Sequence, residues 1–197
     1  AMGGKRTLLI DVDQRRSTLY KYFEVHRKPG LSEHLLEQVP LERVIQKTAV
    51  ENLDLIAGGS PPPNPAELAA SNSLKNLVHS MREKYDIVLL DTPPILVCTD
   101  PISTLDSADG IILVVRMERT NFRSLELATE ALHRVDADIL GVVFNHTNRR
   151  FGAPYYYLYR HYKPYSYYSG YGYYNYYTSY YEKMEKEEDT KQTSETS

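Results

Sequence analysis

Short apolar runs alternate with amphipathic stretches along the first 147 residues. Five runs have the length and composition of strands that are buried on both faces of a parallel sheet. They are residues 7–12, 53–57, 85–90, 111–115 and 139–144. Apolar residues recur at helical spacing in 66–84 and 122–135, and 30–36 has the pattern of a turn entering a short helix with Ser32 as its N-cap. Strands that alternate with helices predict an α/β domain of three layers around a mostly parallel sheet.

The pattern changes at the carboxyl end of the chain. Fifteen of the 18 tyrosines lie between Tyr155 and Tyr181, separated mainly by Gly, Ser, Asn and Pro. No packed core offers a buried face and a hydroxyl partner to so many tyrosines. The last 16 residues are polar and carry six acids and three lysines. We therefore predict a domain over 1–150, a disordered tyrosine-rich cluster over 151–181 and a charged, disordered terminus over 182–197.

Composition narrows the class of protein. A chain of 197 residues fits one domain and a tail. The formal charge of −3 equals that of the terminus alone, so the remainder lacks the basic footprint of a nucleic-acid-binding protein. The single cysteine, Cys98, excludes an internal disulfide and fits a reducing compartment. No apolar run approaches the roughly 18 residues of a membrane span.

Polar side chains follow the carboxyl ends of the predicted strands. Asp11 and Asp13 follow the first strand, Asp91 the third and Asn145 the last. Ligands of open parallel sheets bind outside these ends, and an acid placed like Asp91 can hold water on Mg²⁺. Carboxylates two residues apart in an extended segment point the same way, and their repulsion favours a metal or a proton-accepting role. The alternative is an acidic strand end balanced by neighbouring arginines such as Arg15.

Several segments, in order, resemble the bacterial tyrosine kinases. KRTLLIDVDQRRSTLYKYF is similar to the family's modified second Walker motif, hhhDxDxRxP. NLDLIAGGSPPPNPAELAAS is similar to its PPNPxELLxS segment, YDIVLLDTPPILVCTD to its Walker B region, and ADGIILVVR and ILGVVFNHTN to its later strands. A tyrosine-rich carboxyl terminus is its autophosphorylation cluster. The resemblance covers about residues 5–181 and implies membership of the MinD/ParA-like P-loop ATPases that drive capsular and exopolysaccharide export.

The resemblance implies a role for each matching residue. Asp13 would act at Mg²⁺ and help to activate the incoming tyrosine hydroxyl, while Asp11 would position water on the ion. Asp91 would hold the same ion through water, and Asn145 would contact the adenine ring of ATP. Arg15 would stabilise phosphate charge or a neighbouring subunit.

The resemblance also implies the phosphoacceptors, which are the tyrosines of the cluster. They are Tyr155, Tyr156, Tyr157, Tyr159, Tyr162, Tyr165, Tyr167, Tyr168, Tyr171, Tyr173, Tyr174, Tyr176, Tyr177, Tyr180 and Tyr181.

The chain departs from the family pattern in two places. Ser17 stands where the family usually has Pro, with no obvious effect on the chemistry. No GxxxxGK[ST] loop precedes the DxD strand, although this loop cradles the β and γ phosphates. We therefore expect a P-loop NTPase-like sheet that lacks the P-loop strand and exposes strand edges. We also expect that the sequence is truncated at its amino end and that, as it stands, it binds ATP poorly and is inactive.

The function implied by the resemblance is a cytoplasmic tyrosine autokinase at the inner face of the cell membrane. It would form a ring of identical subunits and phosphorylate the tails of neighbours, with a membrane activator that regulates polysaccharide chain length and a tyrosine phosphatase as partners. A non-catalytic regulator that accepts phosphate is the main alternative. A MinD/ParA-like partition ATPase is disfavoured by the tyrosine tail. A platform for single-stranded nucleic acid is disfavoured because few cations accompany the tyrosines.

Overall fold

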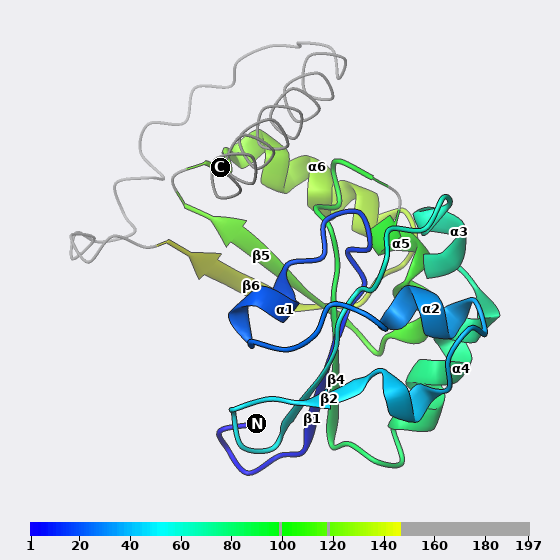
Figure 1. The fold of residues 1–197 in the computed structure, drawn as a ribbon. Coiled ribbons are helices and arrows are strands. Elements are labelled where there is room, and N and C mark those ends of the chain that lie inside the picture. Colours follow the sequence, from blue (N-terminus) through cyan, green and yellow to red (C-terminus); the bar gives the residue numbers. More distant parts are fainter. Residues whose placement is uncertain (99, 118, 147–197) are drawn as a thin grey trace, which may run out of the picture. The chain divides into compact units, whose positions relative to one another are not determined.

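The computed structural model describes residues 1–98, 100–117 and 119–146 (Figure 1). The chain divides into two compact units, and each is described by itself below. The first unit consists of residues 1–113 and 126–141, and the second of residues 114–125 and those from 142 onward. The predicted tyrosine cluster and charged terminus lie outside the described residues, so the predictions made for them stay predictions.

A four-stranded sheet forms the centre of the first unit. Its strands are β1 (Thr7–Asp11), β2 (Ile45–Lys47), β3 (Leu53–Ile56) and β4 (Ile87–Asp91), in the order β2-β3-β1-β4. Strand β1 runs parallel to β3 and β4, and β2 runs antiparallel to β3. The predicted α/β fold with a mostly parallel sheet is therefore confirmed. The sequence analysis missed β2, which has only three residues and no apolar run.

Short helices connect these strands. They are α1 (Leu19–Tyr22), α2 (Leu31–Leu35), α3 (Pro65–Ala69), α4 (Asn72–Met81) and α5 (Asp100–Ser103), with 3-10 turns η1 (Leu41–Arg43) and η2 (Leu105–Ser107). The helical pattern predicted over 66–84 is confirmed, but as the two helices α3 and α4 and not as one. The helix breaks at Ser71, whose Oγ accepts a hydrogen bond from the Leu74 N–H and caps α4.

Ser32 does not cap α2 as predicted. The N-cap is Gly30, whose N–H donates to the Glu33 carboxylate at 2.8 Å. The Ser32 hydroxyl lies within 2.6 Å of the carbonyl oxygens of both Gly58 and Ser60, so it ties α2 to the loop after β3. The prediction failed because these partners are 26 and 28 residues away in the sequence.

The hydrophobic core lies on one side of the sheet, where α2, α3 and α4 also lie (Figure 1). Leu8 and Ile10 of β1 are fully buried there. They belong to a cluster that also contains Val12, Leu31, Leu35, Val44, Ile56, Ala69, Leu74, Leu77, Val78 and Met81. Burying each large aliphatic side chain stabilises the fold by about 1.5–3 kcal/mol. This core fixes the positions of β1 and β4, whose carboxyl ends carry the candidate site.

Strand β4 is an edge strand within the described residues, because it pairs with β1 alone. Ile87 and Leu89 are 41% and 45% exposed, although apolar strands of parallel sheets are normally covered on both faces. This is the kind of exposed edge expected for a sheet of this fold without the P-loop strand.

The remaining strands form a sheet of their own. Strands β5 (Ile111–Arg116) and β6 (Ile139–Asn145) pair with each other, and α6 (Phe122–His133) connects them. All three elements agree with the predicted ones within two residues. The ends of β5 and β6 belong to the second unit. Across residues 1–98, 100–117 and 119–146, no helix has both the length and the apolar content to cross a membrane.

Candidate active site

Two of the predicted acids end neighbouring strands. Asp11 ends β1 and Asp91 ends β4, and the two residues are Cα partners in the parallel register. The Val12 N–H donates to the Asp91 carbonyl at 2.8 Å and holds this register beyond the last pair. Neighbouring strands lie about 4.8 Å apart, and side chains in register point to the same face. The structure therefore brings these two carboxylates together, as predicted.

Asp11 is a buried carboxylate with one oxygen that can still accept a hydrogen bond. Its side chain is fully buried, and Oδ2 accepts hydrogen bonds from Ser17 Oγ at 2.8 Å and from the Leu19 N–H at 3.4 Å. Oδ1 is also buried and has no hydrogen-bond partner in the described part of the chain. Burial raises the pKa of Asp11 more than these hydrogen bonds lower it. The free oxygen suits a water molecule or a cation.

Ser17 contacts the site directly, which the sequence analysis missed. Its Oγ donates to Asp11 and accepts the Gly58 N–H at 3.2 Å. The approach is close enough that a Cβ on Gly58 would lie 2.7 Å from the Cβ of Ser17. The exchange of the family's usual Pro for Ser was the available signal, because proline has no hydroxyl with which to make either bond.

Asp13 is half-buried and more accessible than Asp11. Its Oδ1 accepts the Arg16 N–H at 2.9 Å. Burial raises the pKa of Asp13, and the charge of Asp100 raises it further, against the opposing effects of Arg16 and Arg15. Asp13 is therefore easier for a reacting group to reach than Asp11, and its basicity is raised.

Asp91 lies at the exposed rim of the site. Partial desolvation of its carboxyl group, together with the negative charges of Asp11 and Asp13, raises its pKa to about 6. The charge of Asp13 also raises the pKa of Asp11, so the three carboxylates share one electrostatic environment. An added cation would lower all three pKa values.

Arg15 is held by a residue that sequence reasoning did not find. Its Nε donates to Asp100 Oδ2 at 2.8 Å and its Nη2 to Oδ1 at 3.2 Å. Asp100 opens α5, 85 residues further along the chain, and only folding brings the two together. The sequence carried no local signal for this pair.

Asn145 ends β6 in the second unit, whereas the three acids belong to the first unit. Its backbone oxygen accepts the Met117 N–H at 3.1 Å, and its side-chain oxygen accepts the His146 N–H at 2.7 Å. The structure thus shows where Asn145 lies in its own unit, and the contact with adenine stays a prediction.

The described ranges contain no preformed set of direct metal ligands. Among residues 1–98, 100–117 and 119–146, no three His, Cys, Asp or Glu side chains are arranged to hold a metal ion. Mg²⁺ usually keeps several water ligands and takes one or two carboxylates from the protein. The predicted Mg²⁺ site, held partly through water, therefore stays a prediction.

Comparison with known proteins places the chain in a family. Residues 1–140 match the family described as AAA domain. The chain is 40% identical over 149 residues to the tyrosine-protein kinase Ptk of Acinetobacter johnsonii, covering 76% of this chain and 20% of Ptk. It is 32% identical over 159 residues to CapB of Staphylococcus aureus, which is also named as a tyrosine-protein kinase, covering 81% and 70%. The chain spans about a fifth of the length of the first relatives that it matches.

Solved structures agree with this assignment. The kinase domain of the Escherichia coli tyrosine kinase ETK superposes with a TM-score of 0.73 at 30% identity, over 84% of this chain and 62% of that one. MinD of Pyrococcus horikoshii, solved with Mg-ADP, superposes with a TM-score of 0.59 at 23% identity over 72% and 58%, which shows a shared fold. The chain therefore belongs to the bacterial tyrosine-protein kinases, which have the fold of the MinD/ParA-like P-loop NTPases.

Proposed function

We propose that this chain is the phosphotransfer part of a tyrosine autokinase. It would pass the γ-phosphoryl group of ATP to tyrosines in the carboxyl-terminal segment of a neighbouring subunit. The observation that carries the proposal is the gathering of Asp11, Asp13 and Asp91 at the carboxyl ends of two paired strands. Relatives that are named tyrosine-protein kinases support the class of reaction.

Asp11 and Asp91 fit a Mg²⁺ ion that keeps several of its water ligands. Asp11 Oδ1 is buried without a partner in the described residues, and the pKa of Asp91 is raised to about 6 by desolvation and by the other two acids. A cation would relieve both unfavourable effects. Asp11 and Asp91 would hold it, partly through water, and Asp13 would lie beside it. When bound, the ion would neutralise charge on the phosphoryl oxygens.

Asp13 is the residue that we expect to receive the proton of the incoming tyrosine. It is half-buried and therefore reachable, and burial raises its pKa, which makes it a better base. The phenolic oxygen would bond to the γ-phosphorus as the bond to the bridging oxygen of ADP breaks. Little covalent work falls to the protein, so positioning and charge neutralisation dominate.

The tyrosine-rich segment would supply the acceptor. An extended chain from Tyr155 to Tyr181 reaches on the order of 90 Å, enough to enter an adjacent subunit of a ring. Tethering raises the local tyrosine concentration to roughly the millimolar range, so weak recognition suffices. Many equivalent tyrosines tolerate loose register.

Phosphorylation would then control assembly. Each phosphate adds about −1.5 to −2 charges, so phosphorylated tails would repel one another and the acidic site. We propose that this loosens a homo-oligomer that works with a membrane activator of polysaccharide export at the cytoplasmic face of the membrane, and that a tyrosine phosphatase resets it. An equal native mass before and after phosphatase treatment would contradict this part.

A non-catalytic regulator is the second candidate function. The sequence of 197 residues contains no GxxxxGK[ST] motif, the loop that would cradle the β and γ phosphates of ATP. Asp11, Asp13 and Asp91 argue against this candidate, because a protein that only accepts phosphate does not need three acids in one electrostatic environment.

Phosphotyrosine mass spectrometry tests the two candidates. The full-length gene product would be incubated with Mg·ATP beside Asp13→Ala and, as a matched control, Asp106→Ala. Asp106 is an exposed acid that pairs with Lys75. We expect labelled tail tyrosines in the wild type and in Asp106→Ala, and none in Asp13→Ala. Equal labelling in all three removes the catalytic assignment, and no labelling in any of them favours the regulator.

A further inference from the structure

Asp100 is a buried acid beside the candidate site that no step above uses. It is the first residue of α5, and its side chain is 2% exposed. Both of its carboxylate oxygens accept hydrogen bonds from Arg15, at 2.8 Å from Nε and at 3.2 Å from Nη2. Two parallel bonds of this kind fix the direction of a guanidinium group as well as its position.

The pair is asymmetric. The Arg15 side chain is 49% exposed, although its partner is buried. A buried carboxylate is costly unless it is paired, so Asp100 needs Arg15. Packing alone, however, does not explain why the arginine stays half-exposed at the rim. The arrangement anchors one edge of the guanidinium group in the protein and leaves the rest accessible.

The anchored arginine lies close to the acids. Arg15 follows Asp13 by two residues. Burial has the largest effect on the pKa of Asp13, the charge of Asp100 raises this pKa as well, and the charge of Arg15 lowers it. Arg15 Nη1 has no hydrogen-bond partner within the described ranges. Its two N–H groups are therefore free to bind an anion beside Asp13.

We propose that Asp100 is a positioning residue that orients Arg15, so that the free Nη1 edge binds phosphoryl oxygens of the nucleotide. The inference rests on the proposed kinase function. Without Asp100, the charge of Arg15 would be drawn to Asp13 and would occupy the group that receives the proton. With Asp100, the cation is held ready for the phosphoryl group, and Asp13 stays available.

Chemical rescue with guanidinium tests this division of roles. Arg15→Ala in the full-length gene product is expected to lower kcat by roughly 100- to 1,000-fold, the usual range for losing one oriented donor in the transition state. Millimolar guanidinium chloride should restore part of this loss, because Asp100 still offers its two oxygens. The double variant Arg15→Ala/Asp100→Asn should gain nothing. Arg82→Ala, from the surface pair with Asp109, serves as the control that neither loses activity nor responds.

Two outcomes overturn the proposal. One is equal rescue of the single and the double variant, and the other is a wild-type rate in Arg15→Ala. Arg15→Lys gives an independent measure if the double variant does not fold, since it leaves Asp100 paired with a cation. It is expected to lower kcat about tenfold with little change in KM for ATP, because a lysine lacks the fork. An unchanged kcat in this variant also overturns the proposal.

An NMR measurement separates this inference from the kinase function. The Arg15 ¹⁵Nε–¹H resonance should be visible in the wild type and in Asp91→Asn, and lost in Asp100→Asn at an unchanged circular dichroism spectrum. A resonance that persists in Asp100→Asn overturns the positioning role. Failure of the kinase function is recognised differently, by equal tail labelling in the wild type and in Asp13→Ala.

Discussion

The acids at the amino ends and at the carboxyl ends of the strands in the four-stranded sheet differ in how their charge is compensated. At the amino ends of the strands, Asp54 accepts hydrogen bonds from the Tyr85 hydroxyl at 2.6 Å and from Lys47 Nζ at 2.8 Å. Asp86 accepts hydrogen bonds from both the backbone N–H and the side chain of Arg6. At the carboxyl ends, Asp11 keeps a buried oxygen without a partner in the described residues, and the pKa of Asp91 rises to about 6.

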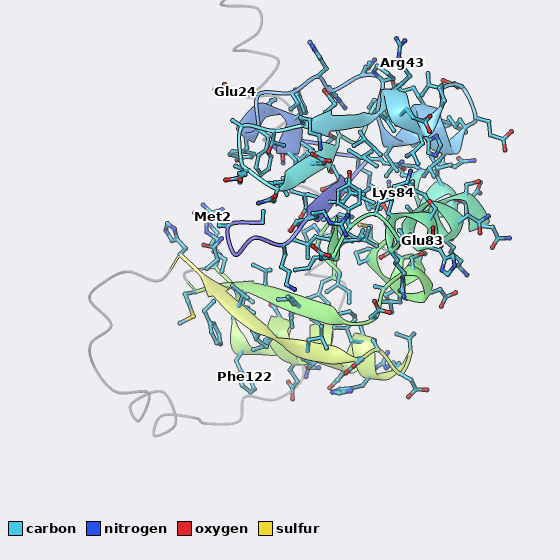
Figure 2. All side chains as sticks on the ribbon, turned by 90° about the horizontal axis from the view of Figure 1, so that it is seen from below. Met2, Glu24, Arg43, Glu83, Lys84 and Phe122 are labelled. Atoms are coloured by element: carbon cyan, nitrogen blue, oxygen red, sulfur yellow. The ribbon has the colours of Figure 1, made fainter. Side chains whose placement is uncertain are left out.

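The difference separates acids whose charge is compensated within the protein from acids whose charge is not. The partners of Asp86 lower its pKa, whereas desolvation and mutual repulsion raise the pKa of Asp91. A hollow of about 460 Å³ lies at the amino-end edge, close to the turn where Figure 2 shows Lys84. Its size alone does not mark a site, because Asp54 in its lining is already paired with Tyr85 and Lys47. Uncompensated charge is the better guide.

The largest effect on the rate of phosphorylation is expected at Asp91, and Asp54 provides the comparison. Asp91→Asn is expected to lower tail phosphorylation by the full-length gene product roughly 10³-fold, because it weakens the hold on the cation that would neutralise phosphoryl charge in the transition state. Asp54→Asn, at the opposite edge, should leave the rate per folded molecule unchanged. Rates from radiolabelled ATP, normalised to the folded fraction, measure both. Similar losses in the two variants would break the distinction between the edges.

Stability should respond in the opposite order. Asp54→Ala leaves the Tyr85 hydroxyl and Lys47 without their acceptor, and it is expected to lower the free energy of unfolding by about 1–3 kcal/mol. Tyr85→Phe removes one hydrogen bond and serves as the milder control, at about 1 kcal/mol. Urea denaturation followed by circular dichroism measures these changes. A loss in Tyr85→Phe as large as in Asp54→Ala would show that Asp54 does not organise this edge.

Removing a negative charge at the carboxyl ends of the strands should make the protein more stable. The pKa of Asp91 is about 6 in the folded protein, against 3.8 for an unperturbed aspartate, so ionisation costs the folded state stability as pH rises through about 6. Asp91→Asn should therefore raise the free energy of unfolding at about pH 7.5 without divalent cations. The full shift is worth roughly 3 kcal/mol, and solvent screening at this exposed group reduces it to about 1 kcal/mol.

This gain must disappear below about pH 4, where the carboxyl group is protonated in both states. Urea titrations of the wild type and Asp91→Asn at several pH values, in the presence of a chelator, measure the window. A constant difference between the two proteins from acid to neutral pH would show that packing, and not charge, separates them.

The smallest effect is expected at Asp86. Hydrogen bonds from the Arg6 backbone and side chain lower its pKa, so its contribution to stability is present above the unfolded pKa and is lost as pH falls. The group is exposed, so salt should screen most of it. Asp86→Asn should lower Tm slightly in dilute buffer and not at all in about 1 M salt. A loss that salt does not change would point to the backbone hydrogen bond alone.

Sequence reasoning succeeded where the signal was local and periodic. The runs ending at Asp11 and Asp91 were interpreted as buried strands because consecutive apolar residues dominate them, and their register follows from parallel pairing. It failed at Ser32, where tertiary partners take the hydroxyl group, and it did not find the break at Ser71 within the helical pattern of 66–84. Ser17 was undervalued because its effect depends on Gly58, 41 residues away.

The sequence by itself determined the α/β class, the strands that carry the acids, and the kinase family, because hydrophobic periodicity and short motifs are local properties of the chain. Only the tertiary structure decided which acids are compensated. Asp54 lies inside one apolar run and Asp91 follows another, but the neighbours of neither residue show whether its charge is compensated. The partners that compensate an acid come from other segments of the chain. Tyr85 and Lys47 reach Asp54, and Arg15 reaches Asp100, only when the fold is assembled.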